Sequence, residues 1–232
     1  MSKVSVLTLT LGRELYIRRL FESIDLLGGD FPDEHVIVFQ GTPPSDELNV
    51  LFLGHPNHKN IHIEVLDTNV GIEVAMKKFV PQMEGDLIMK MDDDCIIRSP
   101  KFFNHAKDIH ERFPNLFFSP YPVGLTGSPG GPSALNREVF YSDSFDVHYT
   151  FRVVSHIGGF ARFAPAKYFK PICSDLIDSQ TNDIKGEDVQ VAMQCTHNQI
   201  PMAYLENQLI VEHHETGLGQ KQRYGDTYDH PH

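Results

Sequence analysis

The sequence has 232 residues, of which 41% are hydrophobic and 22% are charged. That balance suits one α/β domain with a sizeable core and excludes a disordered chain. The formal net charge is −11, with carboxylates spread along the chain. Nucleic acids and anionic membranes attract clustered Lys and Arg, so neither is expected as a partner. A divalent cation that carries a phosphorylated substrate suits such an acidic protein better.

Three cysteines occur at wide spacing, and they match neither a disulfide framework nor a CxxC metal site. The N-terminus leads directly into an apolar stretch and has no signal-peptide layout. No apolar run approaches the ~20 residues that a membrane helix requires. We therefore expect a soluble, cytoplasmic protein without a membrane span.

Strand and helix patterns alternate through residues 1–100. Runs of Val, Ile and Leu predict strands at residues 4–11, 35–39, 61–66 and 87–91. The spacing of apolar residues predicts helices at residues 13–27 and 69–79. This alternation predicts an α/β fold with a doubly wound, mostly parallel sheet and flanking helices. Ligands bind such sheets beyond the carboxyl ends of the strands.

The chain after residue 100 is less regular. Gly158 and Gly159 mark either a turn or an open space beside a bound ligand. In chain order we expect a loop over 119–133, mixed strands over 145–163, a helix over 188–197, a strand over 202–211 and a mobile polar tail over 217–232.

Three adjacent carboxylates, Asp92, Asp93 and Asp94, follow the predicted strand at residues 87–91. Neighbouring carboxylates repel one another, and a bound cation relieves the repulsion. Oxygen ligands suit Mg²⁺ or Mn²⁺, which also bind substrate phosphates. A solvated acidic turn is the alternative, but the position at a strand end favours a metal site.

Two further segments carry residues of catalytic type. Glu187 and Asp188 open a predicted helix, where a carboxylate serves either as a cap or as a general base. His213 and His214 end a predicted strand, so only one of them faces a site if the strand continues. Adjacent histidines are often surface residues, and metal binding is the alternative.

The order of these motifs resembles the GT-A glycosyltransferases, and most closely their large inverting family 2. The resemblance rests on Leu-Thr-Leu-Gly-Arg at a strand end, Asn-Val-Gly at a helix start, the aspartates, Gly-Glu-Asp and a strand ending in His. It covers residues 4–215. A narrower resemblance is to transferases of this size, encoded by large algal DNA viruses, that glycosylate capsid protein.

The resemblance implies one Rossmann-like domain over residues 1–232, with a nucleotide-binding half at 1–100 and a smaller, mixed acceptor and catalytic half at 101–216. Asp92 and Asp94 match the ends of the family's Asp-x-Asp motif, which would hold the metal together with His213. The remaining positions of the family's donor site correspond to Thr10, Arg13, Asn69, Lys77 and Asp93. Asp188 corresponds to the family's general base, and Glu187 to its neighbour.

Gln40 departs from the family's pattern, which has an Asp that recognises uracil at the end of the second strand. The amide of Gln40 offers both a donor and an acceptor to a pyrimidine. A UDP-sugar is therefore the favoured donor and a dTDP-sugar the second choice.

The expected activity is metal-dependent, inverting transfer of a sugar from a nucleotide diphosphate to a hydroxyl of a glycan or glycoprotein. Mn²⁺ or Mg²⁺ would assist, and Asp188 would deprotonate the acceptor. The alternatives are a non-catalytic sugar-nucleotide-binding module and a sugar-nucleotide nucleotidyltransferase. The latter is disfavoured because no Gly-rich phosphate loop bearing Arg and Lys follows the first strand.

Overall fold

The computed structural model describes residues 2–26, 30–123, 136–180 and 185–213. The helices are α1 Glu14–Leu26, α2 Asp46–Gly54, α3 Ile72–Phe79, α4 Phe102–Arg112, α5 Ala166–Ser174 and α6 Glu187–His197, with short turns η1 His58–Asn60 and η2 Val80–Gln82. The strands are β1 Val4–Thr10, β2 Glu34–Gln40, β3 Ile61–Leu66, β4 Leu87–Asp92, β5 Cys95–Ile97, β6 Phe117–Ser119, β7 Tyr121–Val123, β8 Asn136–Ser142, β9 Val147–Val154, β10 Ala161–Pro165, β11 Met202–Leu205 and β12 Ile210–His213.

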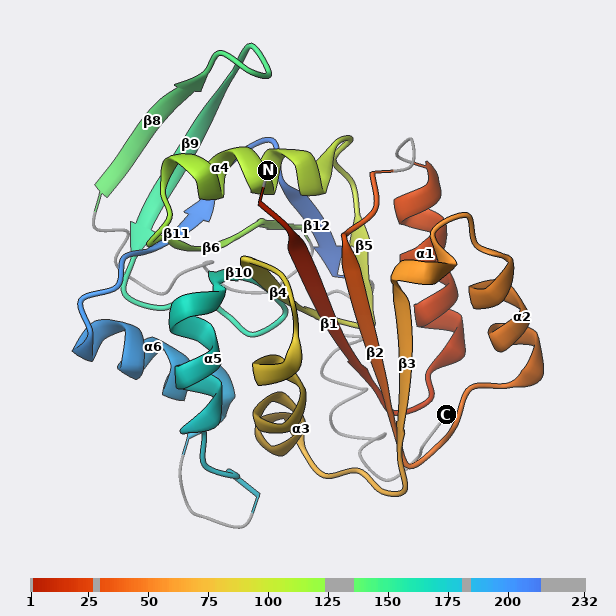
Figure 1. The fold of residues 1–232 in the computed structure, drawn as a ribbon. Helices are drawn as coiled ribbons and strands as arrows, with labels where there is room; N and C mark the ends of the chain where they lie inside the picture. The colour runs from red at the N-terminus through yellow and green to blue at the C-terminus, as the bar shows by residue number, and fades with distance from the viewer. Residues whose placement is uncertain (1, 27–29, 124–135, 181–184, 214–232) are drawn as a thin grey trace.

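A large sheet of nine strands runs through the molecule in the order β3-β2-β1-β4-β10-β6-β11-β9-β8 (Figure 1). Its first four strands are parallel, and they confirm the four strands predicted from apolar runs. The predicted helices at residues 13–27 and 69–79 are found as α1 and α3. Because these strands are parallel, the carboxyl ends of β1, β2 and β4 lie on the same side of the sheet.

The other half of the sheet is mixed. β10 pairs antiparallel with both β4 and β6, β11 is parallel to β6, and the β8–β9 hairpin projects from the far edge (Figure 1). The expected mixed strands at residues 145–163 are found as β9 and β10. The α/β class, the mostly parallel sheet and its mixed second part are therefore confirmed.

A second, small sheet has the order β5-β12-β7. It corrects two predictions. The single strand expected over residues 202–211 is two strands, β11 in the large sheet and β12 in the small one. Between them the chain turns at Gln208, which has a φ of 66°. The predicted loop at 119–133 contains β7 in its described part, because β7 has a partner in β12 that its own sequence does not reveal.

Helices cover both faces of the large sheet. Side chains of α1 and α2 pack on Ile37 and Phe39 of β2, and Phe102 of α4 contacts Phe163 of β10 on the same face. The opposite face is covered by α3, α5 and α6, with Phe169 of α5 under Arg162 of β10. The sheet is thus doubly wound, as the alternating pattern predicts.

Among the described residues, each helix is either too short or too polar to cross a membrane. All three cysteines are buried and unpaired. The mobile tail predicted at 217–232 lies outside the described residues.

Candidate metal and catalytic site

The aspartate triplet sits where β4 ends and turns into β5. Asp92 is the last residue of β4, while Asp93 and Asp94 form the turn. The side chain of Asp92 is one-third exposed, whereas Asp93 and Asp94 are buried. Each of the three carboxylates meets different partners.

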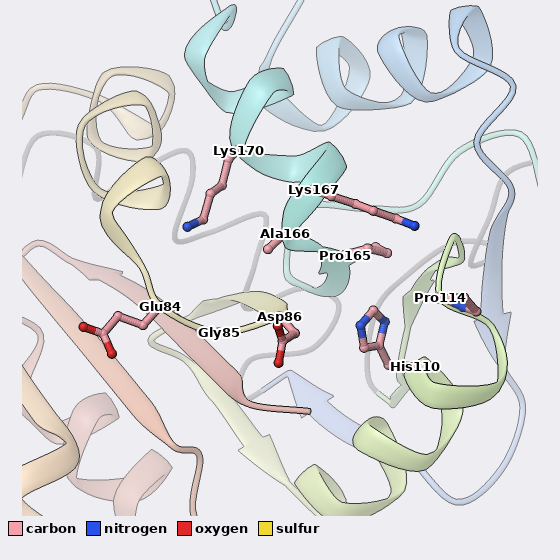
Figure 2. Close-up of a pocket in the computed structure, with 9 residues that line it drawn as sticks. All are labelled: Glu84, Gly85, Asp86, His110, Pro114, Pro165, Ala166, Lys167 and Lys170. Carbon is pink, nitrogen blue, oxygen red and sulfur yellow. The ribbon is translucent and has the colours of Figure 1, made fainter. Parts of the chain in front are cut away.

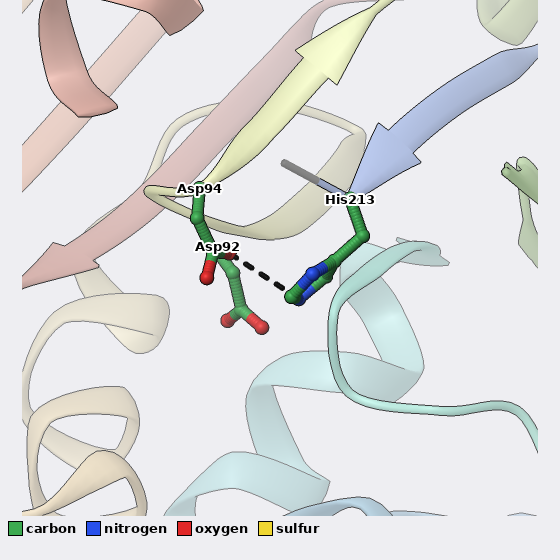
Figure 3. A group of neighbouring side chains, drawn as sticks. All are labelled: Asp92, Asp94 and His213. Carbon is green, nitrogen blue, oxygen red and sulfur yellow. Dashed lines mark ion pairs between the residues drawn. The ribbon is translucent and has the colours of Figure 1, made fainter. Parts of the chain in front are cut away.

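Asp92 and Asp94 lie together with His213 (Figure 3). One ligand atom from each of the three residues lies within 4.8 Å of the other two. Nε2 of His213 is 3.4 Å from Oδ1 of Asp94, and both side chains are buried. Metal–oxygen distances of ~2.0–2.6 Å place the ligands of one ion within ~5 Å of one another. The three residues therefore fit a single divalent cation.

The small sheet explains how His213 reaches the aspartates. β12 pairs antiparallel with β5, and His213 lies opposite Cys95, the residue directly after Asp94. Within β12, Val211 and His213 are buried while Ile210 and Glu212 are partly exposed. This alternation turns the His213 ring inward. His214 lies outside the described residues.

Asp93 does not belong to this group and is fully buried, in contact with Arg13 and Thr10. The Thr10 hydroxyl donates to Oδ2 of Asp93 at 2.6 Å, and the Arg13 guanidinium makes a bidentate contact with the carboxylate. Arg13 also lies 3.6 Å from Oδ2 of Asp94. Thr10, Arg13 and Asp93, all predicted to contact a donor, thus contact one another.

The ammonium of Lys90 donates to Asp92, two residues along β4. Lys90 is almost completely buried in the sheet. Burial alone would lower the pKa of its ammonium, but Asp92 and Glu187 outweigh that effect and raise the pKa. Lys90 and Arg13 thus offset part of the negative charge of the triplet. From the sequence, a bound metal ion was the only cation expected there.

The carboxylates of the Glu187–Asp188 pair point to different places. Glu187 is buried and accepts from the Arg162 guanidinium, with Lys90 Nζ 3.7 Å away. Asp188 is 37% exposed, and its Oδ2 lies 3.4 Å from Nε2 of His156. The hydrogen bond with His156 lowers the pKa of Asp188, although partial burial opposes it. Of the two carboxylates, Asp188 is the one open to a substrate.

The segments after β2 and β3 form a second part of this edge. Gln40 is buried, and its Oε1 accepts from the backbone N–H of Val70 at 3.1 Å. Asn69 accepts from the N–H of Gly71, which has a φ of 83° and is the N-cap residue of α3. Lys77 lies exposed on α3. Gln40 and Asn69 thus build the turn between β3 and α3.

Sequence reasoning missed Lys90, Arg162 and His156. Lys90 left a signal, since a lone lysine within Leu-Ile-Met-Lys-Met requires a buried partner in any buried strand. Arg162 left the same signal within Phe-Ala-Arg-Phe-Ala. Their partners lie far away in sequence, so only the fold identifies them. His156 left none.

A separate pocket of about 440 Å³ opens at the other end of β4 (Figure 2). Its polar lining comes from Glu84, Asp86, His110, Lys167 and Lys170. Lys167 donates to Asn115 and Lys170 to the Met83 carbonyl, so both ammonium groups already contact protein atoms. Because it lies at the opposite end of β4 from the aspartates, the pocket is not part of the candidate metal and catalytic site.

No protein-family model and no curated protein matches the sequence. Solved structures match the fold. GalNAc-T7 with UDP, GalNAc and Mn²⁺ is 11% identical, with a TM-score of 0.67 over 93% of this chain and 45% of that one. S. aureus TarS 1-349 in complex with UDP-GlcNAc is 21% identical, with a TM-score of 0.56 over 90% of this chain and 58% of that one.

A third similar structure is the mannosyltransferase PcManGT from Pyrobaculum calidifontis in complex with GDP-Man and Mn²⁺. It is 10% identical, with a TM-score of 0.63 over 91% of this chain and 56% of that one. This chain thus spans about half the length of the three proteins. These likenesses show that it has the GT-A glycosyltransferase fold.

Proposed function

We propose that the protein is a metal-dependent glycosyltransferase that moves a sugar from a nucleotide diphosphate to an acceptor hydroxyl with inversion. The observation that carries the proposal is the group formed by Asp92, Asp94 and His213. It lies beyond the carboxyl end of β4, on the side of the sheet where such folds bind their ligands. Similar folds have been solved with UDP or GDP-mannose and Mn²⁺, which supports this choice of substrate and metal.

Asp92, Asp94 and His213 would hold the cation. The imidazole nitrogen favours Mn²⁺ over Mg²⁺, which prefers an all-oxygen shell. When bound, the ion would neutralise the charge of the departing diphosphate. Arg13 lies beside Asp94 and would add a second positive charge near the donor.

Asp188 would act as the general base. The acceptor oxygen attacks the anomeric carbon while the bond from that carbon to the diphosphate oxygen breaks, and the hydroxyl proton passes to Asp188. Attack from the face opposite the leaving group inverts the configuration. Because its pKa is lowered, Asp188 is ionised at neutral pH and ready to accept that proton.

The side chain of Gln40 favours a donor whose nucleobase presents a carbonyl oxygen. Its own Oε1 is engaged by the Val70 N–H, which leaves the amide N–H groups as donors. Uracil and thymine both offer carbonyl oxygens, so UDP-sugars remain the first choice and dTDP-sugars the second.

The test is the release of nucleoside diphosphate from a panel of UDP-, dTDP- and GDP-sugars, with and without acceptors, in Mn²⁺, Mg²⁺ or EDTA. We expect release in Mn²⁺ and none in EDTA. Asp94→Asn should abolish release, whereas Asp143→Asn, which removes an exposed carboxylate in the turn between β8 and β9, should not.

Three other outcomes would contradict the proposal. Tight binding of a sugar nucleotide without release under any condition would identify a binding module. Formation of sugar nucleotide from a nucleoside triphosphate and a sugar phosphate would identify a nucleotidyltransferase. Undiminished turnover in EDTA, with metal content verified as nil, would remove the metal from the mechanism.

A further inference from the structure

Four charged side chains of alternating sign form a row from Asp92, a member of the proposed metal site, to Arg162, and all of them except Asp92 are buried. Asp92 accepts from the Lys90 ammonium, Lys90 Nζ is 3.7 Å from Oε1 of Glu187, and Oε2 of Glu187 accepts from Arg162. Lys90, Glu187 and Arg162 are exposed by only 2%, 6% and 0%. Such ions are stable in the interior only when each has its partner.

The sheet itself creates the need for Glu187. In the antiparallel pairing of β10 with β4, Arg162 lies directly opposite Lys90. Paired residues share a face of the sheet, so two buried cations stand side by side and repel each other. Glu187 enters from the first turn of α6 and contacts both. Glu187 thus connects the first turn of α6 to two cations of the sheet.

Gly159 makes the approach of Glu187 feasible. A Cβ at position 159 would lie 2.3 Å from Oε1 of Glu187 and 3.5 Å from Cβ of Asp188. The Gly159 carbonyl also accepts from Lys90 Nζ at 2.6 Å. Lys90 thus contacts three separate segments: the end of β4, the loop before β10 and α6.

We propose that Lys90 is a positioning residue that fixes the base-bearing start of α6 relative to the metal-binding Asp92, with Glu187 as its anchor. The inference rests on the proposed function, because it assigns Asp92 to the metal and Asp188 to the acceptor proton. In this role Lys90 acts through its contacts with Asp92, Gly159 and Glu187. Glu187 takes no proton from the acceptor, since both of its oxygens face buried cations.

The sign of the Lys90 charge separates this role from general support of the fold. A cation beside Asp92 opposes the binding of a second cation there. Replacing Lys90 with Met should therefore leave Mn²⁺ affinity unchanged or increase it. The same replacement releases α6, which displaces Asp188 and lowers kcat. A residue that only stabilises the fold would affect both quantities in the same direction.

The experiment is a double-mutant cycle of Lys90→Met and Glu187→Gln, with kcat, donor KM and Mn²⁺ affinity measured for each variant. Each single replacement should lower kcat by about 10- to 100-fold, the range for an active site misplaced by about 1 Å. The double variant should be no slower than the slower single variant, because both changes remove the same contact, the one between Lys90 and Glu187. Lys59→Met, on the exposed turn η1, is the matched control.

Multiplicative losses in the double variant, or a loss of Mn²⁺ affinity in Lys90→Met that parallels the loss of kcat, would overturn the proposal. Lys90→Arg keeps the charge and should retain more turnover than Lys90→Met, which guards against a variant that simply fails to fold. Urea unfolding of all variants without metal supplies the same cycle independently of activity. Coupled stability losses in a protein that releases no nucleoside diphosphate would contradict the proposed function alone, whereas additive stability losses would contradict the Lys90–Glu187 contact.

Discussion

Asp188 and Glu187 are adjacent in sequence, yet they occupy opposite electrostatic surroundings. Glu187 lies between Lys90 and Arg162, while Asp188 is open to solvent and paired with His156. The pattern Gly-Glu-Asp predicts a reactive carboxylate but does not say which of the two residues is reactive. The structure favours Asp188, because a base must reach the acceptor hydroxyl.

Replacing Asp188 with Asn should lower turnover by about two to four orders of magnitude, the usual loss when a general base is removed. Affinity for UDP should stay nearly constant, because Asp188 lies outside the metal group. Steady-state kinetics and calorimetry check the two quantities. A loss of donor binding in proportion to the rate would make Asp188 structural, and a larger rate effect for Glu187→Gln would reverse the roles of the pair.

We predict that His213, and not His214, completes the metal shell. Its ring is buried and lies beside Asp94, so His213→Ala should weaken Mn²⁺ binding more than His214→Ala does. Titration of each apo variant with Mn²⁺ gives the comparison without any need for activity. The opposite ranking would mean that the histidine assignment is off by one residue.

At the scale of elements, the predictable parts are those whose pattern is local. Apolar runs predicted β1 to β4, and periodic spacing predicted α1 and α6. The sequence did not predict β8, because its residues are mostly exposed and polar, or β7, because it is only three residues long. The single strand predicted over residues 202–211 divides between two sheets, a choice that depends on partners elsewhere in the chain.

The same reasoning explains which candidate site residues could be predicted from the sequence. Asp92, Asp94 and His213 lie at or just after the ends of strands, and strand ends are where such folds place ligands. Lys90, Glu187 and Arg162 select one another through the register of β4 with β10 and the approach of α6. No local pattern encodes that register. Gly159 was expected to mark a turn or a space for a sugar, but its missing side chain makes room for Glu187.

Gly159→Ala should displace the start of α6. The added Cβ would lie 2.3 Å from the Glu187 carboxylate, so we expect a loss of about 1–3 kcal/mol in unfolding free energy and a lower kcat. Gly54→Ala is the matched control, because a Cβ there meets no atom within 4 Å. Urea unfolding measures both variants. Equal stabilities would show that Glu187 moves aside without penalty.

At the scale of the whole molecule, His35 makes stability depend on pH. The ring is fully buried between α1 and β2, stacked on Phe21 and bonded to Thr8. Burial, with a smaller effect of His55, lowers the pKa of His35 from 6.5 to about 3. Below pH 6.5 the His35 ring therefore binds a proton in the unfolded chain but stays neutral in the folded protein, so the free energy of unfolding falls as pH falls.

Between pH 7 and pH 5 this group should remove about 2 kcal/mol of unfolding free energy. Urea unfolding at both pH values measures the change. His35→Gln should flatten the dependence by that amount, whereas His62→Gln, on the exposed side of β3, should leave it intact. An unaltered pH dependence in His35→Gln would assign the effect to other histidines.

The metal group also has a consequence for synthesis on the ribosome, because its members stand at residues 92, 94 and 213. At ~5–20 residues per second, the interval between the second aspartate and the histidine is on the order of 6–24 seconds. The residues of β1 to β4 are synthesised before this interval, and so are Arg13 and Lys90, the cations that contact Asp93 and Asp92 in the folded protein. Arg162, Glu187 and His213 emerge later. If Asp92, Asp94 and His213 bind the metal as proposed, the complete site can form only late in synthesis, and a shorter nascent chain would lack one of its ligands.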